Sequence, residues 1–192
     1  MPKVGMEPVR RRQVIDGTIA CIHSEGLGAA SLKAIARHAG VTPTLILHYF
    51  DDKDGVIEAV YRDLYSRLAA ETLTRLQSAQ TPRARLVAIL EAQVSPQMVS
   101  KDVVTAWFAL SALASDKPTL RRMERINAAR LMSNMIHALR MAGFNRSEAR
   151  ATAQELMALV YGLWTLLAHG TVDRPDAARY ILLRALDGRI PN

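Results

Sequence analysis

The residues best suited to chemistry lie between positions 31 and 56, in the segment SLKAIARHAGVTPTLILHYFDDKDGV. Their hydroxyl, imidazole and ammonium groups can donate hydrogen bonds to phosphate oxygens or read the edges of bases. Thr44 and His48 are the expected readers of base edges. Lys53 combines its charge with the free N–H groups of a helix N-terminus, which is a favourable place for a phosphate. The segment therefore predicts contact with double-stranded DNA.

Two short helices joined by a tight turn are needed to present these side chains. Ser31 is the expected cap of a helix that Gly40 ends, since glycine permits the turn. Thr42 followed by Pro43 then begins a second helix, which runs to about Tyr49. This order predicts a helix-turn-helix whose second helix enters the major groove.

A run of three arginines, Arg10 to Arg12, comes before the periodic apolar stretch that starts at Val14. We expect it to precede the first helix and to reach phosphates or an adjacent minor groove. Positions 42–49 contain no Asn, Gln or Arg, so we expect specificity to depend on DNA shape and water-mediated contacts. The predicted DNA-contacting residues are Arg10, Arg11, Arg12, Ser31, Lys33, Thr42, Pro43, Thr44, Leu45, His48, Tyr49 and Lys53.

The balance of charge agrees with a polyanionic partner but does not locate the site. Lysine and arginine number 25 against 18 aspartates and glutamates, and the net charge is +7. Such a chain favours nucleic acid over membrane. Residues 1–50 carry six basic and three acidic side chains, and residues 66–192 carry seventeen and ten. The excess is therefore spread along the chain.

The rest of the chain also has helical periodicity, interrupted by a capping residue and a proline at Thr81-Pro82 and Ser95-Pro96. We expect further helices near 53–78, 82–94, 101–115, 118–142, 146–169 and 175–187. The predicted fold class is all-α with about nine helices, a three-helix head on a larger helical body. Residues 1–52 are the expected DNA-binding domain, and residues 53–192 the expected effector-binding and dimerisation domain.

Several classes of protein are disfavoured by what the sequence lacks. A single cysteine, Cys21, cannot form an internal disulfide; we expect a buried, inert thiol and a cytoplasmic protein. We expect no membrane span, because no run of about 18 apolar residues occurs. The motifs HExxH, GxSxG and the P-loop are absent, and His23, His38, His137 and His169 show no metal-ligand spacing, so we expect no enzyme, cofactor or metal.

Residues 11–60 resemble the DNA-binding region of the TetR family of transcriptional regulators. The resemblance lies in Ile15, Gly26, IARHAGV and HYFDDKDGVIEAV. It implies that residues 42–49 form the recognition helix, that Lys53 contacts phosphate and that the Ser31 hydroxyl touches the DNA backbone. A closer similarity, in MPKVGMEPVRRRQVID, TAWFAL, RINAARLMSN and ALVYGLW, is to the branch of this family that senses choline and represses glycine betaine synthesis. It implies a repressor that binds a palindromic operator and responds to an effector.

A homodimer is expected because one small head contacts few phosphates, whereas two heads can read a palindrome. The resemblance implies that the apolar helix 155–168 and the last helix pair with their copies in a four-helix bundle. The alternative is that both helices fill the core of a single chain. The predicted dimer residues are Leu156, Leu159, Val160, Leu163, Leu167, Ile181, Leu182 and Ala185.

The effector site is expected among four aromatic residues, Trp107, Phe108, Tyr161 and Trp164. Each cation–π contact between a quaternary ammonium ion and an aromatic face contributes about 0.5–2 kcal/mol to binding. The resemblance makes choline the first candidate for the effector. Tyr161 occupies a position where related repressors often have an acidic residue. Ser111 occupies a position where the corresponding helix of those repressors has more aromatic residues. The alternative is a regulator of other genes with a different amine or an apolar ligand. A non-specific chromosome-coating protein is the third reading.

Overall fold

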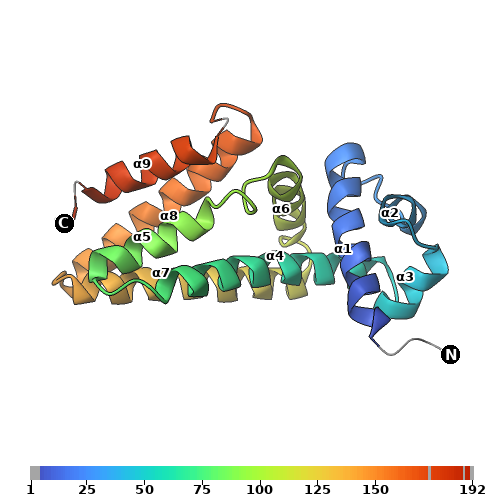
Figure 1. Ribbon diagram of the computed structural model, residues 1–192, viewed down its shortest axis with the longest axis horizontal. Coiled ribbons are helices and arrows are strands. Elements are labelled where there is room, and N and C mark those ends of the chain that lie inside the picture. Colours follow the sequence, from blue (N-terminus) through green and yellow to red (C-terminus); the bar gives the residue numbers. More distant parts are fainter. Residues whose placement is uncertain (1–4, 173, 188, 191–192) are drawn as a thin grey trace. The chain divides into compact units, whose positions relative to one another are not determined.

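The computed structural model describes residues 5–172, 174–187 and 189–190. Over these residues it contains nine α-helices and no strand, which confirms the predicted all-α fold class (Figure 1). The helices are α1 (Met6–Glu25), α2 (Leu32–Ala39), α3 (Pro43–Phe50), α4 (Lys53–Leu76), α5 (Pro82–Gln93), α6 (Lys101–Leu113), α7 (Pro118–Met141), α8 (Arg146–Ala168) and α9 (Pro175–Asp187). None of these described helices combines the length and apolar character needed to cross a membrane.

The capping residues act as their sequence positions predict. The Ser31 Oγ accepts a hydrogen bond from the Ala34 amide at 3.2 Å. Thr42 Oγ1 accepts one from the Leu45 amide, also at 3.2 Å. Gly40 has φ +62°, in the left-handed region that glycine enters without strain. These three residues fix where α2 ends and α3 begins.

The chain forms two compact units. Unit 1 contains residues up to Tyr65 together with Lys101–Glu124, and unit 2 contains Ser66–Ser100 and the residues from Arg125 onward. Unit 1 therefore includes α1–α3, the first part of α4, all of α6 and the start of α7. The division at residue 52 into DNA-binding and effector-binding domains is a functional one and stays a prediction.

In unit 1, α1 packs closely against α2 because Gly17 has no side chain. A Cβ at Gly17 would lie 2.6 Å from the Cα of Ala39, which is far closer than atoms in van der Waals contact. The helices bury an apolar core that includes Val14, Ile35 and Ile46, each without solvent exposure. α1 also contacts α6, where His23 Nδ1 lies 3.2 Å from Thr105 Oγ1.

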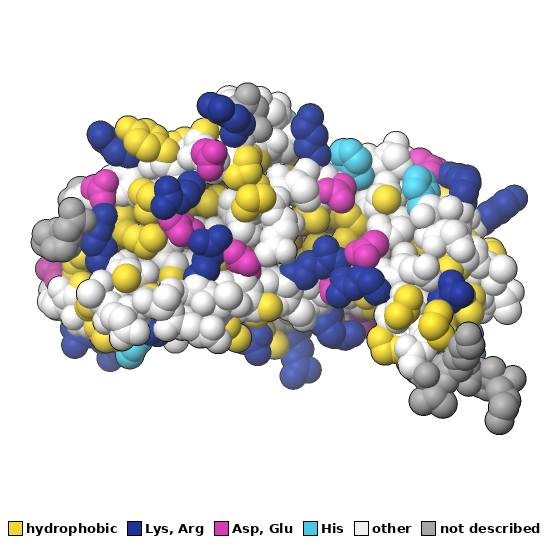
Figure 2. Space-filling view, viewed as in Figure 1, with side chains coloured by type: hydrophobic (Ala, Val, Ile, Leu, Met, Phe, Trp, Pro, Cys, Tyr) yellow, Lys and Arg dark blue, Asp and Glu magenta, His cyan; other side chains and the backbone are white. Residues whose placement is uncertain are grey.

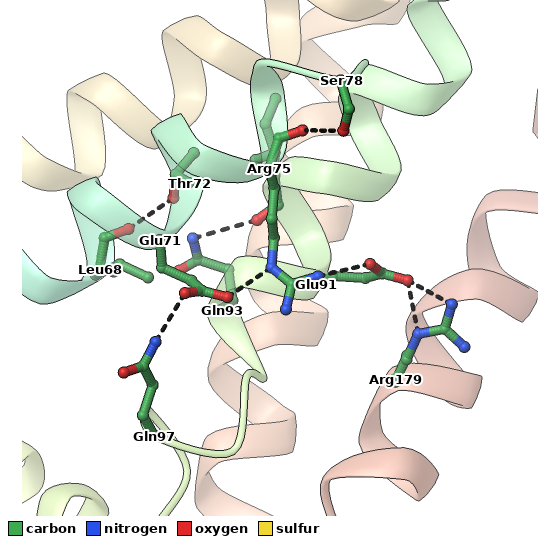
Figure 3. A network of polar contacts seen from close by, with 10 residues as sticks. Leu68, Glu71, Thr72, Arg75, Ser78, Glu91, Gln93, Gln97 and Arg179 are labelled. Atoms are coloured by element: carbon green, nitrogen blue, oxygen red, sulfur yellow. Dashed lines mark hydrogen bonds and ion pairs between the residues drawn. The ribbon is translucent and has the colours of Figure 1, made fainter.

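In unit 2, α5 and α9 are joined by a network of charged side chains centred on Glu91 (Figure 3). Arg75 donates to Glu91 at 2.9 Å and to Glu71 at 2.7 Å, and Arg179 of α9 donates to Glu91 at 2.6 Å. α9 also packs against α8. The helix α8 begins with a capping box, in which Asn145 and Glu148 each accept the other's backbone N–H.

Candidate nucleic-acid interface

The outer face of α3 is formed by side chains that no other part of the head covers. Thr44, Leu47 and His48 are exposed and lie on one face because they are three and four residues apart. The opposite face inserts Ile46 and Phe50 into the core, with 0% and 4% exposure. The buried pair fixes the rotation of α3 about its axis, so the exposed face has a defined direction.

Leu47 is a functional candidate that the sequence analysis missed. Its side chain is 43% exposed on the same face as Thr44 and His48. An exposed aliphatic group on a helix that enters the major groove can contact the methyl group of thymine. The signal was available in the sequence, because position 47 follows Thr44 by three residues. Leu45, which the prediction included, is instead half-buried at the edge of this face.

Two hydroxyl groups lie where the helices α2 and α3 begin. Ser31, Lys33, Thr42 and Pro43 are all exposed. The oxygens of Ser31 and Thr42 accept the capping hydrogen bonds, and each hydroxyl keeps its own hydrogen to donate. Helix capping and a hydrogen bond to a phosphate are therefore compatible at both positions.

Tyr49 is half-buried and is held by its neighbours in α3 and α1. Its ring meets the ring of His48 edge-on, with centroids 4.9 Å apart. The Tyr49 carbonyl oxygen accepts a hydrogen bond from Arg11 Nη1 at 2.6 Å. The same guanidinium lies 4.5 Å from the centroid of the Phe50 ring, a cation–π contact. The C-terminal end of α3 is thus fixed by Arg11.

Arg10, Arg11 and Arg12 do not lie where the sequence analysis places them. They lie inside α1, which begins at Met6, so the prediction that they precede the first helix is wrong. The residues before Val14 continue the helix because none of positions 9–13 is a helix-breaking residue. Arg12 makes a two-pronged ion pair with Asp63 of α4, at 2.8 and 2.9 Å. Arg10 donates to Gln13 at 2.9 Å. DNA contact by these arginines stays a prediction.

Lys53 is the first residue of α4 and is partly exposed. Among the described residues its ammonium group has no ion-pair partner. Asp52 already accepts a hydrogen bond from the Gly55 amide at 2.7 Å, so one N–H of the α4 terminus is occupied. Lys53 is available to a phosphate through its side chain.

A polar cluster formed by Glu25, Arg37 and His38 joins the C-terminal ends of α1 and α2. Arg37 Nη2 and His38 Nε2 each lie 2.5 Å from Glu25 Oε1. Hydrogen bonds from His38 and Arg37 lower the pKa of the Glu25 carboxyl group. The sequence analysis missed this cluster because its members are twelve and thirteen residues apart. Its geometry is that of an ion-paired link between the helices.

Cys21 lies beside this cluster. Its sulfur and the ligand atoms of Glu25 and His38 all lie within 4.8 Å of one another. The thiol is fully buried, and burial together with the Glu25 charge raises its pKa. Cys21 is therefore a protonated thiol, as expected for an inert buried cysteine.

The four predicted ligand-binding aromatics have different surroundings. In unit 1, Trp107 is 7% exposed and packs edge-on against Tyr65, with ring centroids 4.6 Å apart, while Phe108 is 37% exposed. In unit 2, Trp164 is buried and donates from Nε1 to the Gln93 carbonyl oxygen at 2.9 Å, and Tyr161 is 49% exposed. A role for each in ligand binding stays a prediction, and Trp164 has a structural role already.

Half of the predicted dimer residues are buried within the single chain. Leu156, Val160, Leu163 and Leu182 are at most 4% exposed in the core of the protomer. Their part in a dimer stays a prediction, since apolar periodicity marks a buried face without saying what buries it. Four positions are partly exposed and remain candidates: Leu159, Leu167, Ile181 and Ala185. The exposed stripe of α8 instead runs through Ala158, Tyr161, Gly162, Thr165 and Leu166.

Positive charge does not form a single basic field on the face of the molecule drawn in Figure 2. On the face drawn in Figure 2, lysine and arginine side chains are scattered among acidic and apolar ones. This agrees with the even spread of charge along the sequence. The candidate interface is therefore defined by the exposed face of α3 and its flanking hydroxyl and ammonium groups.

Comparison with known proteins covers nearly the whole chain. Residues 14–60 match the family of bacterial regulatory proteins of the tetR type, and residues 82–191 match the C-terminal region of BetI-type transcriptional repressors. The regulator BetI of Pseudomonas paraeruginosa is 41% identical over 166 residues, which are 85% of this chain and 84% of that protein. BetI 2 of Chromohalobacter salexigens is 38% identical over 191 residues, 97% of this chain and 91% of that protein.

Solved structures share the fold. A transcriptional regulator from Saccharomonospora viridis, solved in complex with choline, superposes with a TM-score of 0.83 at 20% identity, covering 95% of this chain and 98% of that one. The matched helix-turn-helix contains the exposed face of α3, and the second matched region spans α5 to α9. The chain therefore belongs to the TetR family of DNA-binding transcriptional regulators, in its BetI-type branch, and is not an enzyme.

Proposed function

We propose that this regulator binds a palindromic operator as a homodimer, represses transcription in the cytoplasm, and responds to a small effector. The observation that carries the proposal is the exposed face of α3, where Thr44, Leu47 and His48 project while Ile46 and Phe50 anchor the helix. Two such faces spaced by about one helical turn of DNA, roughly 34 Å, can read two half-sites.

Footprinting on the DNA upstream of the protein's own gene tests this proposal. A repressor of this kind protects one palindromic site, and binding weakens with salt because Lys53 and other cations displace counterions from phosphates. Binding at equal strength to any sequence would instead identify a chromosome-coating protein and contradict the proposal.

Substitutions at the candidate interface make the test specific. His48→Ala and Tyr49→Ala are expected to weaken operator binding, by about 1–3 kcal/mol for a residue at a base edge. Lys53→Ala should weaken binding to all sequences and reduce the salt slope by about 1. Lys101→Ala is the matched control, because it removes an exposed lysine from the start of α6. Wild-type affinity in all three interface variants would show that α3 is not the reading helix.

We further propose that the effector is choline or another small quaternary ammonium ion. The proposal is supported by the match to BetI-type repressors and by the choline complex of the S. viridis regulator. Binding would favour a state in which α4 moves the two heads to a spacing that fits the operator less well. A ligand can shift this balance only by its differential affinity for the two states. Operator titrations with and without choline measure the shift, and an unchanged affinity would contradict a role as effector.

A further inference from the structure

Three side chains that can ligate a metal ion meet in unit 1, where the C-terminal ends of α1 and α2 lie together. Cys21 and Glu25 are four residues apart on α1, so they lie on one face of that helix. His38 belongs to the last turn of α2. The Cys21 sulfur, a carboxylate oxygen of Glu25 and a ring nitrogen of His38 all lie within 4.8 Å of one another. We call these three residues the Cys21 triad.

The spacing of these atoms is close to that of a tetrahedral zinc site. A Zn–S bond of about 2.3 Å and Zn–N or Zn–O bonds of about 2.0–2.1 Å place two ligand atoms about 3.3–3.6 Å apart. Glu25 Oε1 and His38 Nε2 are hydrogen-bonded at 2.5 Å, so a metal between them would separate them by about 1 Å. The sulfur would move inward by at most a similar amount. Side-chain rotations provide shifts of this size without moving either helix.

The chemistry of the three ligands favours zinc among divalent cations. Thiolate, imidazole and carboxylate are all zinc ligands, whereas Mg²⁺ and Ca²⁺ prefer oxygen ligands alone. Burial and the Glu25 charge raise the pKa of the Cys21 thiol, so it keeps its proton until a metal displaces it. When the S–Zn bond forms, that proton passes to solvent. The ionised Cys21 and Glu25 then balance the two charges of Zn²⁺, and His38 binds as a neutral ligand.

The triad is open to solvent on one side. The side chains of Glu25 and His38 are 31% and 24% exposed, whereas Cys21 is fully buried beneath them. A metal ion can therefore enter from solvent, bind the sulfur on its inner side and keep a water molecule as its fourth ligand.

Arg37 competes with a metal ion for Glu25, but only weakly. Its side chain is 64% exposed, and an ion pair this open contributes little to stability. Arg37 and His38 both contact Oε1 of Glu25. Among the described residues none donates a hydrogen bond to Oε2. A metal could therefore bind Glu25 through either oxygen with little loss.

We infer that the Cys21 triad binds one zinc ion per chain, which ties α2 to α1. The inference replaces the sequence expectation of no metal, which rested on the spacing of histidines. That spacing could not show the triad, because two of its ligands are not histidines and His38 lies on the next helix, thirteen residues after Glu25.

A zinc ion at this place would stabilise the helix that supports α3. His38 lies two residues before Gly40, the turn through which α2 leads into α3. Three bonds to one ion hold the two helix ends together more firmly than an exposed ion pair. Because zinc would bind the folded head and not the unfolded chain in this geometry, it should raise the melting temperature.

Competition for Zn²⁺ between the reduced protein and a chromophoric chelator tests the inference. Wild-type protein should bind one equivalent of Zn²⁺. Cys21→Ala and His38→Gln should each weaken this binding at least about ten-fold, since even the loss of a residue that only orients a ligand costs that much. His23→Gln is the matched control, because it removes an exposed histidine from the same helix and should bind Zn²⁺ as tightly as wild type.

Cobalt(II) provides a second readout, which zinc bound elsewhere on the surface would not give. A Co²⁺ ion bound to a thiolate has a sulfur-to-metal charge-transfer band in the near ultraviolet. The band should appear with wild type and His23→Gln and be absent with Cys21→Ala. Zn²⁺ should likewise raise the melting temperature of wild type and leave that of Cys21→Ala unchanged.

Circular dichroism checks that each variant is folded. If Cys21→Ala does not fold, His38→Gln against His23→Gln decides. The inference is overturned if wild-type protein does not bind Zn²⁺, if both triad variants bind it as tightly as wild type, or if the cobalt complex lacks the charge-transfer band. Each of these results leaves the proposed operator binding and effector response unaffected, because neither uses the Cys21 triad.

Discussion

Arg11 connects α3 to α1 through two different interactions. Its guanidinium donates to the carbonyl oxygen of Tyr49, in the last turn of α3, and lies over the Phe50 ring. A cation at a helix C-terminus also complements the helix dipole. Because α3 has only eight residues, it cannot be stable alone, and its position depends on such contacts.

We predict that Arg11→Ala destabilises the protein by about 1–2 kcal/mol, the sum of a charged hydrogen bond and a cation–π contact at a partly exposed site. Operator binding should weaken as well, although Arg11 is bonded within the protein. Urea unfolding and operator titration measure the two effects. Arg10→Ala, which removes only a bond to Gln13, is the control. Equal stability of both variants would contradict the role assigned to Arg11.

Glu25 gives the head a defined dependence on pH. The pKa of its carboxyl group is lowered by His38 and Arg37, so the folded state favours the ionised form more than the unfolded state does. The resulting stabilisation is present above the ordinary glutamate pKa, about 4.3, and is lost as the pH falls through the lower value in the folded state. It does not change as the pH rises from neutral.

We therefore predict that Glu25→Gln lowers the melting temperature at pH 7. The difference in melting temperature between this variant and wild type should shrink as the pH approaches 3. Thermal unfolding followed by circular dichroism across this range provides the measurement. Glu58→Gln should show no such convergence. A constant difference between Glu25→Gln and wild type from pH 7 to pH 3 would rule out the ionised link.

At the scale of the helices, the crossing of α1 and α2 determines how the helix-turn-helix is supported. Gly17 allows the backbones to approach until the Cα of Ala39 fills the space that a side chain would occupy. The contact involves backbone atoms, so a clash could be relieved only by moving a whole helix. The sequence analysis identified the turn glycine, Gly40, but had no reason to single out Gly17, since a glycine inside a helix does not reveal what lies beside it.

Gly17→Ala is predicted to destabilise the head by about 1–3 kcal/mol, the range for overpacked cores, although alanine favours a helix by about 1 kcal/mol. Gly28→Ala adds the same methyl group in the same unit, where nothing lies within 4 Å, and should be nearly neutral. Denaturant unfolding of both variants compares them directly. A stabilised Gly17→Ala variant would show that α1 and α2 do not pack this closely.

At the scale of the whole molecule, the proposed dimer must use surfaces that the single chain leaves uncovered. The stripe of α8 through Tyr161 and Leu166 meets this requirement, with 49% and 38% exposure, and Tyr180 on α9 is 62% exposed. On this exposed face only Gly162 and Thr165 lie between Tyr161 and Leu166, and their short side chains permit close approach of a second helix. This makes the exposed side of α8 a better candidate for the partner face than the buried leucines of the same helix.

We predict that Leu166→Glu raises the dissociation constant of the dimer at least about ten-fold, since a charge in an apolar interface is left without a partner. Sedimentation equilibrium gives the constant, and operator affinity should fall in parallel. Leu73→Glu, which alters a 63% exposed leucine of unit 2 on α4, should remain dimeric. A dimeric Leu166→Glu variant would place the interface elsewhere.

The sequence determined the helices and the exposed face of α3 that we propose as the DNA-binding face. Capping hydroxyls, prolines and turn glycines act within a few residues of their own position, so Ser31, Gly40 and Thr42 were read correctly without a structure. Helical periodicity likewise assigned Thr44 and His48 to one exposed face. These features depend on residues that are close together in the sequence, so they can be predicted without a structure.

Only the tertiary structure decided which side chains meet across helices. Arg11 and Arg12 look like a basic arm in the sequence, yet they bond to residues 38 and 51 positions away. Glu124 pairs with Tyr61 at a separation of 63 residues, and Leu156 and Leu163 of α8 are buried in the core of the chain. Periodicity shows that a face is apolar or charged, but the partner of that face follows from how the helices pack, because long-range contacts are set by the whole core.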